Sequence, residues 1–221
     1  MRLFLTGTPA ADIVAHLPST TLSGIVYLGS VFTTYHIGLC VTPFAQEKVT
    51  KLISSESSAD DIQQTIVTLY DAIFDKISDD PDPAASLSRR MDRWDTQSSW
   101  LGYSWHQTTE NRKCVISRKQ DSEPLFALGR EGFPVLIVQG KDDRIVVCEK
   151  IVEEAKKHFT NLDVAIVNDG GNHAPFYGNP GEVMKHIGSF VKKVQVSSQR
   201  THQWNCITLT IVVQVGAGKG V

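Results

Sequence analysis

The sequence predicts an α/β protein with a mostly parallel sheet and a helical insertion. The strongest observation is a strand–helix–strand pattern between residues 133 and 176. A helix followed by another short apolar strand lies near the N-terminus, and a long helical stretch at 43–121 separates the two regions. Strands joined by a crossover helix lie parallel in one sheet. We therefore expect one sheet built from both regions, with the helical stretch inserted between its strands.

The strand–helix–strand pattern has three parts. Residues 135–138 form an apolar, β-branched run between Pro134 and Gly140, which is typical of a strand buried on both faces of a parallel sheet. Over residues 148–159 apolar side chains recur every four positions among charged ones, which predicts an amphipathic helix. Residues 164–167 form a second apolar run and predict the second strand.

Each of these strands is followed by a group suited to acid–base chemistry. Asp142 and Asp143 follow the first strand, and His173 follows the second, just after a Gly-Gly pair that allows a sharp turn. Ligands of open α/β sheets bind beyond the carboxyl ends of the strands, and a carboxylate there can hold an imidazole in the tautomer that moves a proton. Either residue type alone has a simpler interpretation, the aspartate as a turn or helix cap and the histidine as a structural or solvated side chain. Their occurrence together at matched strand ends favours a functional pair.

Two motifs built around these residues resemble the acid loop and the histidine loop of the α/β-hydrolase superfamily. They read Gly140-x-x-Asp143-x-x-Val146 and Gly171-Asn172-His173. The superfamily's chain order is nucleophile, acid, histidine, and its acid is the third residue after the glycine, which corresponds to Asp143 rather than Asp142. The resemblance extends from about residue 9 to about residue 194. It implies a partial α/β-hydrolase fold and ester or amide hydrolysis, in which Asp143 orients His173 as the general base.

The resemblance breaks down at the nucleophile. The superfamily carries it on a strand-to-helix elbow, G-x-S-x-G, just before the helix that we predict at residues 10–17. Only residues 1–7 are left for that elbow, Phe4 or its neighbours occupy the position of the serine, and no Ser or Cys occurs before Ser19. Ser30 is a weaker candidate, because the residues around it lack the second glycine of the elbow. The chain thus resembles the C-terminal portion of a hydrolase, and we expect it to be inactive.

The predicted strand at 24–30 is expected to have an open edge, because the superfamily covers that edge with the strand that carries the nucleophile. An open edge exposes unpaired backbone groups and favours self-association. The β-prone run at 206–215 is long enough to cover this edge, either in the same chain or in a neighbour. The alternative is a disordered tail.

The insertion at 43–121 resembles the cap, or lid, that the superfamily carries over its active site. Its clearest predicted helices span 46–53 and 60–77, with Ser58 or Asp60 suited to an N-cap. Its aromatic residues include Trp94, Trp100, Tyr103 and Trp105. These rings either line an apolar acyl pocket or pack the cap onto the core. Residues 124–128 then lead back to the sheet.

A last predicted helix begins at Asn179 and ends at Lys193. Beyond it the chain departs from the superfamily, since residues 197–205 are polar and without a pattern. The glycine-rich ending at 216–221 lacks the residues of a phosphate-binding loop. We divide the chain into a partial hydrolase core at 1–42 and 122–194, a cap at 43–121, and an atypical tail at 195–221.

The composition of the chain limits which partners, cofactors and cellular location we expect. With 41% hydrophobic residues, 21% charged residues and a net charge of −2, the sequence gives no reason to expect nucleic acid or an anionic membrane as a partner. The seven histidines show no ligand-spaced cluster in the sequence, so we expect neither a metal nor another cofactor. The four cysteines form no disulfide-scaffold pattern, the apolar run after Met1 is too short for a signal peptide, and no run approaches membrane-spanning length. We therefore expect a cytoplasmic protein.

Three functions remain open at this stage. The first is that of a serine-hydrolase relative acting on a small apolar ester or amide, inactive here for lack of a nucleophile. The second is that of a non-catalytic protein that binds an apolar ligand under the cap. The third is that of a truncated, non-functional fragment.

Overall fold

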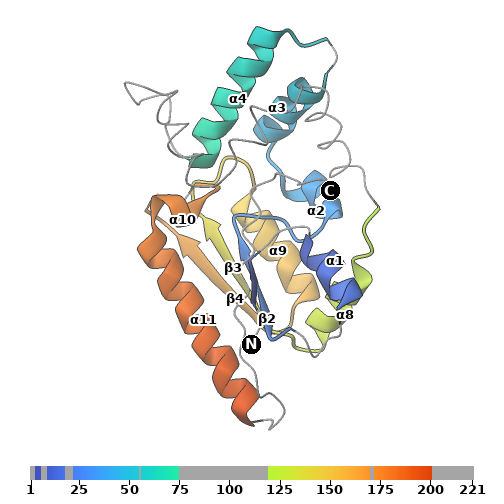
Figure 1. Cartoon of the computed structure of the whole chain (residues 1–221), viewed down its shortest axis with the longest axis vertical. Coiled ribbons are helices and arrows are strands. Elements are labelled where there is room, and N and C mark those ends of the chain that lie inside the picture. Colours follow the sequence, from blue (N-terminus) through green and yellow to red (C-terminus); the bar gives the residue numbers. More distant parts are fainter. Residues whose placement is uncertain are drawn as a thin grey trace.

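A computed structural model describes residues 3–5, 9–17, 22–54, 56–74, 119–169 and 172–200 of the chain (Figure 1). At its centre is a four-stranded parallel sheet with the strand order β1-β2-β3-β4. The strands are β1 (Leu3–Leu5), β2 (Gly24–Leu28), β3 (Val135–Gly140) and β4 (Leu162–Val167). The predicted α/β class with a parallel sheet is therefore confirmed.

The register of the sheet aligns the carboxyl ends of three strands. Val138 of β3 lies between Leu28 of β2 and Ala165 of β4, and Gly140 lies opposite Val167. Every residue of β3 is buried, as its unbroken apolar run predicts for a central strand. The loops that follow β2, β3 and β4 consequently leave the sheet at one edge.

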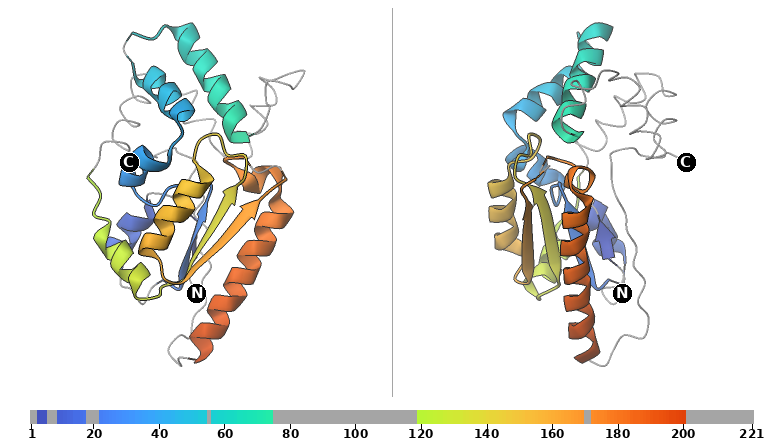
Figure 2. Two further views of the ribbon diagram at one scale, coloured as in Figure 1. Left: turned by 180° about the vertical axis from the view of Figure 1, so that it is seen from behind. Right: turned by 90° about the vertical axis from the view of Figure 1, so that its left-hand side faces the viewer.

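Side chains of the strands alternate between two cores, one on each face of the sheet. The helices around them are α1 (Pro9–His16), α2 (Thr34–Cys40), α8 (Glu123–Arg130), α9 (Cys148–His158) and α11 (Pro180–Arg200). Tyr27 and Ile137 face the core formed with α1, α2, α8 and α9, whereas Val26 and Leu136 face the core beneath α11. Figure 2 shows α9 and α11 on opposite sides of the sheet. Both faces are thus covered by helices, which a parallel sheet requires.

The edge of β2 that we expected to be open is partly covered. Strand β1 pairs with residues 24–26 of β2, so the expectation was wrong for this part of the edge. Phe4, expected at the position of a nucleophile, lies within β1 opposite Ile25. Three apolar residues are too few to give a strand pattern in the sequence, which is why β1 was missed. The tail at 201–221 lies outside the described residues, and its proposed pairing stays a prediction.

Three short helices were not predicted: α2, α8 and α10 (Pro175–Gly178). Helix α8 replaces the simple connection expected at 124–128, and Pro124 stands in its first turn, where a missing N–H has no cost. Helix α11 also continues beyond Lys193 to Arg200, so the irregular structure expected for residues 197–200 was wrong.

Helices α3 (Pro43–Ile53) and α4 (Ala59–Phe74) lie beyond the carboxyl edge of the sheet (Figure 1). Ser58 caps α4: its hydroxyl accepts a hydrogen bond from the Asp61 N–H at 3.1 Å, and its own N–H donates to the Asp61 carboxylate at 3.2 Å. This reciprocal arrangement is a capping box and confirms Ser58 as the N-cap. Residues 75–118, with the four aromatic residues of the predicted pocket, lie outside the described residues. The division into core, cap and tail stays a prediction.

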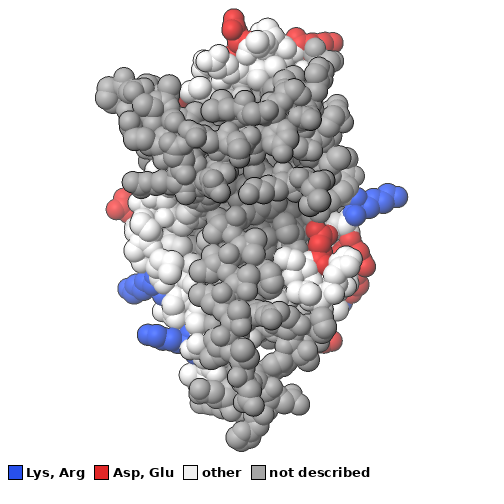
Figure 3. All heavy atoms as spheres, viewed as in Figure 1, with Lys and Arg blue, Asp and Glu red and all other residues white. Residues whose placement is uncertain are grey.

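Charged side chains of both signs lie on the surface. On the face shown in Figure 3, acidic and basic side chains lie on both flanks, with a group of acidic side chains on the flank away from α11. The described part of this face shows no extended patch of a single sign. Among the described helices, none combines the length and the apolar character needed to cross a membrane.

Two glycines give a test of the packing. A Cβ at Gly129 of α8 would lie 2.5 Å from the Phe159 ring and 2.6 Å from the His158 carbonyl oxygen, whereas a Cβ at Gly188 of α11 would meet nothing within 4 Å. We expect Gly129→Ala to lower the free energy of unfolding by about 1–3 kcal/mol, because overpacking forces the backbone to move. Gly188→Ala should raise it by about 0.5–1 kcal/mol, because alanine favours the helix. Urea unfolding measures both, and equal effects of the two substitutions would contradict the packing of α8 on Phe159.

Candidate active site

The candidate site lies where the loops after β2, β3 and β4 leave the sheet. The loop after β3, residues 141–147, carries Asp143, and the loop after β4 carries His173. The Lys141 N–H donates to the Val167 carbonyl at 2.9 Å, which extends the pairing of β3 with β4 into the first loop. The two loops therefore begin side by side.

Four hydrogen-bond donors meet the carboxylate of Asp143. One oxygen accepts the N–H groups of Ile145 and Val146, at 2.7 and 2.9 Å. The other oxygen accepts the Gln139 side-chain amide and faces Nδ1 of His173. The side chain is fully buried, with 0% of its surface exposed. These contacts fix the carboxylate in one orientation.

His173 lies within hydrogen-bond distance of that carboxylate. Its Nδ1 is 3.0 Å from Oδ2 of Asp143, and 25% of its side chain is exposed. The prediction that these two residues meet is confirmed. An ionised carboxylate only accepts hydrogen bonds, so the tautomer that suits this contact has its proton on Nδ1 and leaves an electron pair free on Nε2. Nε2 lies on the opposite side of the ring from Asp143.

Asp143, rather than Asp142, is the aspartate that meets His173, as its spacing from Gly140 indicated. Asp142 is exposed and makes none of the contacts described for Asp143. One carboxylate oxygen of Asp143 accepts two backbone N–H bonds, from the residues two and three positions further on, and this closes a local turn.

Gln139 is a site residue that our interpretation of the sequence missed. It is a buried polar side chain at the end of β3, and its amide N–H donates to the Asp143 carboxylate. A glutamine within an otherwise apolar strand was the available signal, because a buried amide needs partners. Strand β3 therefore precedes Asp143 in the chain and also provides one of the hydrogen bonds that hold its carboxylate.

The chain segment after α2 braces the acid loop. Val41 and Val146 form an isolated antiparallel bridge. On either side of it the Thr42 N–H donates to the Ile145 carbonyl and the Val147 N–H to the Cys40 carbonyl, both at 2.8 Å. The loop that carries Asp143 is therefore held on its far side as well.

The histidine loop is held by a close backbone contact with Gly29. This residue follows β2 with φ of +53°, and a Cβ there would lie 1.9 Å from the His173 carbonyl oxygen. Only glycine combines this left-handed conformation with so close an approach. The loop after β2 therefore limits where the backbone of His173 can lie. Ser30, a weaker candidate for the nucleophile, comes directly after Gly29 and is half-buried.

The end of α4 contacts the other side of the histidine loop. The Ala174 N–H donates to the Ile73 carbonyl at 3.0 Å and also to the Asn172 side chain at 3.1 Å. Phe74 packs edge-on against Tyr177, with ring centroids 5.5 Å apart. The inserted helix pair thus meets the core next to His173.

The nucleophile remains unassigned in the part of the chain that the structure describes. Residues 6–8, which join β1 to α1, lie outside it. The two described cysteines are poor candidates because burial raises the pKa of both thiols, that of Cys40 to about 11. A nucleophilic cysteine needs a lowered pKa.

Comparison with solved structures identifies the architecture. An esterase from a Rhodococcus species superposes with a TM-score of 0.63 at 16% sequence identity, and the match covers 87% of this chain and 65% of that one. A putative aryl esterase from Burkholderia cenocepacia gives 0.61 at 18% identity over 88% of this chain and 65% of that one. A bromoperoxidase from Bacillus anthracis gives 0.54 at 15% identity over 86% and 67%. No protein-family model and no curated protein sequence matches the chain.

The chain therefore has a partial α/β-hydrolase fold, as the resemblance of its motifs implied. It spans about 65% of the length of the two esterases.

Substitution of the two neighbouring aspartates tests the geometry of the acid loop. Asp143→Asn replaces one carboxylate oxygen by an NH2 group, which is a donor and cannot accept the hydrogen bonds that this oxygen accepts now. We expect the free energy of unfolding to fall by about 1–3 kcal/mol. Asp142→Asn, at the exposed neighbour, should change it by less than about 0.5 kcal/mol. Chemical denaturation of both variants checks this. A larger loss in Asp142→Asn would mean that the loop register is wrong.

Proposed function

We propose that Asp143 and His173 are the acid and the base of an ester- or amide-hydrolysing site, and that this chain by itself does not complete the reaction. One observation carries the proposal: the buried, four-donor Asp143 carboxylate lies 3.0 Å from Nδ1 of a partly exposed His173, beyond the carboxyl ends of adjacent parallel strands. The α/β-hydrolase fold supports it, since acid and histidine follow one another along the chain as they do in that fold.

In this proposal His173 acts through Nε2. That atom takes the proton from an attacking hydroxyl and later returns it to the leaving group. Asp143 holds the ring in the required tautomer and stabilises the imidazolium while the proton is on it. Gln139 and the two N–H groups of the acid loop keep the carboxylate in place during this exchange.

The inactivity of the chain is proposed from its sequence. Neither Ser nor Cys stands between β1 and α1, the position of the nucleophile elbow in this fold. Loss of the nucleophile removes most of the catalysis by a triad, and removal of one oxyanion-hole donor alone costs about a hundredfold or more.

A non-catalytic binding function is the alternative, and one contact favours it. Phe74 and Ala174 form a small apolar cluster where α4 meets the histidine loop, with Ile73, Phe176 and Tyr177 packed against it. We propose this junction as the base of a cap over the site. A small apolar ester, amide or ligand is the partner that such surroundings would accept.

We also propose a cytoplasmic location, supported by the free thiols of Cys40 and Cys148. Self-association through a sheet edge stays a proposal too. In the described sheet the end strands are β1 and β4, so these edges are the ones that a second copy would meet.

Esterase assays test the catalytic proposal. The purified chain should hydrolyse a short activated ester no faster than the buffer does, and His173→Ala should leave that rate unchanged. A fluorophosphonate probe should leave the chain unlabelled, because it reports an activated serine. Turnover that His173→Ala abolishes would overturn the inactivity claim, and Ser30→Ala would then show whether Ser30 is the nucleophile.

Thermal melting separates a binder from a non-functional fragment. An apolar ester analogue that occupies the site raises the melting temperature of the chain, because it binds only the folded state. Ala174→Asp, which puts a charge into the junction of α4 with the histidine loop, should abolish the shift. Exposed Asp142→Asn serves as the matched control and should keep it. Absence of any shift across a panel of esters and amides would rule out the binding function.

A further inference from the structure

Three side chains of kinds that can bind a metal ion lie close together where α2 packs on α9. They are His36 on α2 and Glu154 and His158 on α9, and their ligand atoms all lie within 4.8 Å of one another. Glu154 and His158 are four residues apart in one helix, so they lie on the same face. We call this group the α2–α9 cluster.

His36 has a ring nitrogen without a hydrogen-bond partner. The side chain is fully buried, and its Nδ1 lies 2.8 Å from the hydroxyl of the buried Thr33. Nε2 has no hydrogen bond, and Oε2 of Glu154 lies 3.9 Å from it. A buried polar atom left without a partner is unfavourable by about 1–3 kcal/mol, so its retention needs a reason.

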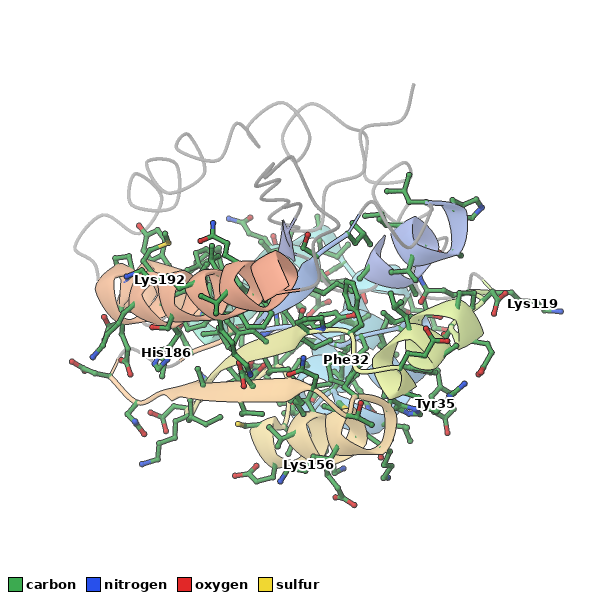
Figure 4. The ribbon with its side chains drawn as sticks, turned by 90° about the horizontal axis from the view of Figure 1, so that it is seen from below. Phe32, Tyr35, Lys119, Lys156, His186 and Lys192 are labelled. Carbon is green, nitrogen blue, oxygen red and sulfur yellow. The ribbon has the colours of Figure 1, made fainter. Side chains whose placement is uncertain are left out.

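Aromatic contacts hold both histidine rings in place. His158 stacks on Phe126 with ring centroids 3.8 Å apart and planes 13° apart, and it meets His36 edge-on at 5.9 Å. His36 in turn lies edge-on against Phe32 and Tyr35. Figure 4 labels these last two residues, and Tyr35 lies there beside α8 and α9. The rings are therefore already oriented before any ligand arrives.

The charges of the cluster suit a cation. Glu154 is ionised, since a hydrogen bond from Lys157 to its Oε1 at 2.6 Å lowers its pKa, and its Oε2 faces His36. Burial lowers the pKa of His36 to about 4 and also lowers that of His158, so both imidazoles are neutral and offer electron pairs. The carboxyl end of α9, where His158 lies, adds the negative end of the helix dipole. Lys157 opposes these effects with one positive charge.

We propose that His36, Glu154 and His158 bind one zinc ion that links α2 to α9. Two imidazoles and one carboxylate are a ligand set that zinc accepts, with water in the fourth position. Tetrahedral zinc with bonds of about 2.1 Å places its ligand atoms about 3.4 Å apart. The ligand atoms of the cluster lie within 4.8 Å of one another, so they would have to move closer together by about 1.4 Å or less. The Thr33 hydroxyl would accept a hydrogen bond from Nδ1 of His36 and so orient the ring, with Nε2 toward the zinc. Ligating histidines usually have such a hydrogen-bonding partner.

This site is separate from the Asp143–His173 pair. Asp143 precedes the first residue of α9, whereas Glu154 and His158 belong to its last two turns. A helix of this length spans about 16 Å. The zinc proposal therefore does not depend on the proposed hydrolytic function.

Titration of the metal-free full-length chain with Zn²⁺ tests the proposal. Isothermal titration calorimetry should give one ion per chain, and Zn²⁺ should raise the melting temperature by mass action. Glu154→Gln and His158→Gln should each weaken binding by at least about tenfold, and Thr33→Val by about 10- to 100-fold. Co²⁺ bound in place of Zn²⁺ should give the visible absorption of a tetrahedral site.

Two matched variants serve as controls. His186 and Glu182 on α11 also stand four residues apart, with 3.8 Å between Nε2 of the histidine and Oε1 of the glutamate. His186→Gln therefore tests whether any partly exposed His–Glu pair at this spacing would bind the ion. It should leave Zn²⁺ binding unchanged. His173→Ala should also leave it unchanged, which keeps this test independent of the proposed active site.

Two results would overturn the proposal. One is the absence of Zn²⁺ binding by a chain whose circular dichroism shows it to be folded. The other is binding that persists unchanged in both Glu154→Gln and His158→Gln, since the ion would then lie elsewhere. These two substitutions affect partly exposed side chains, so the test does not require removal of the buried His36.

Discussion

The carboxylate of Asp143 is the point on which the arrangement of the candidate site depends. Four donors reach it, from the end of β3, from the turn that follows and from the histidine loop. A buried carboxylate is strongly unfavourable unless its oxygens are satisfied, so these donors must stay in place for the loop to fold as it does. The parallel register of β3 and β4 makes this possible, because it starts both loops at the same edge of the sheet.

The site also retains polar groups that are not fully satisfied. Gln139 donates to Asp143, yet its Oε1 has no partner among the described residues, and Nδ2 of the buried Asn172 has none either. Each such atom is unfavourable by about 1–3 kcal/mol. Both residues support the acid–histidine pair directly, through the carboxylate in one case and through the turn at Ala174 in the other. Buried polar atoms without hydrogen bonds lower the stability of the fold, and each one in a native structure calls for an explanation. Here the explanation is that both side chains hold other groups of the candidate site in position.

Apolar patterns in the sequence predicted the elements that are buried regularly. Strands β3 and β4 follow from unbroken apolar runs, and helix α9 follows from apolar residues at every fourth position. The meeting of Asp143 with His173 follows from their places after the two strands. Strand β1 could not be found this way, because three residues carry no period. The α2–α9 cluster could not be found either: His36 and His158 are far apart in the sequence, and only the packing of α2 on α9 brings them together. The sequence shows a glutamine at the end of an apolar strand, but it does not show that Gln139 donates a hydrogen bond to Asp143.

Helix α2 connects the candidate active site with the α2–α9 cluster. At its carboxyl end, Cys40 and the two residues after it pair with the acid loop through the Val41–Val146 bridge and the hydrogen bonds beside it. Near its other end, His36 lies against Glu154 and His158 of α9. Helix α9 has the same two attachments, since it begins just after the acid loop and ends in the cluster. A ligand that holds α2 and α9 together at the cluster would therefore restrain the two segments that flank Asp143, without contacting the acid itself. This link runs through packed helices and backbone hydrogen bonds, which are the rigid elements that can transmit such a restraint.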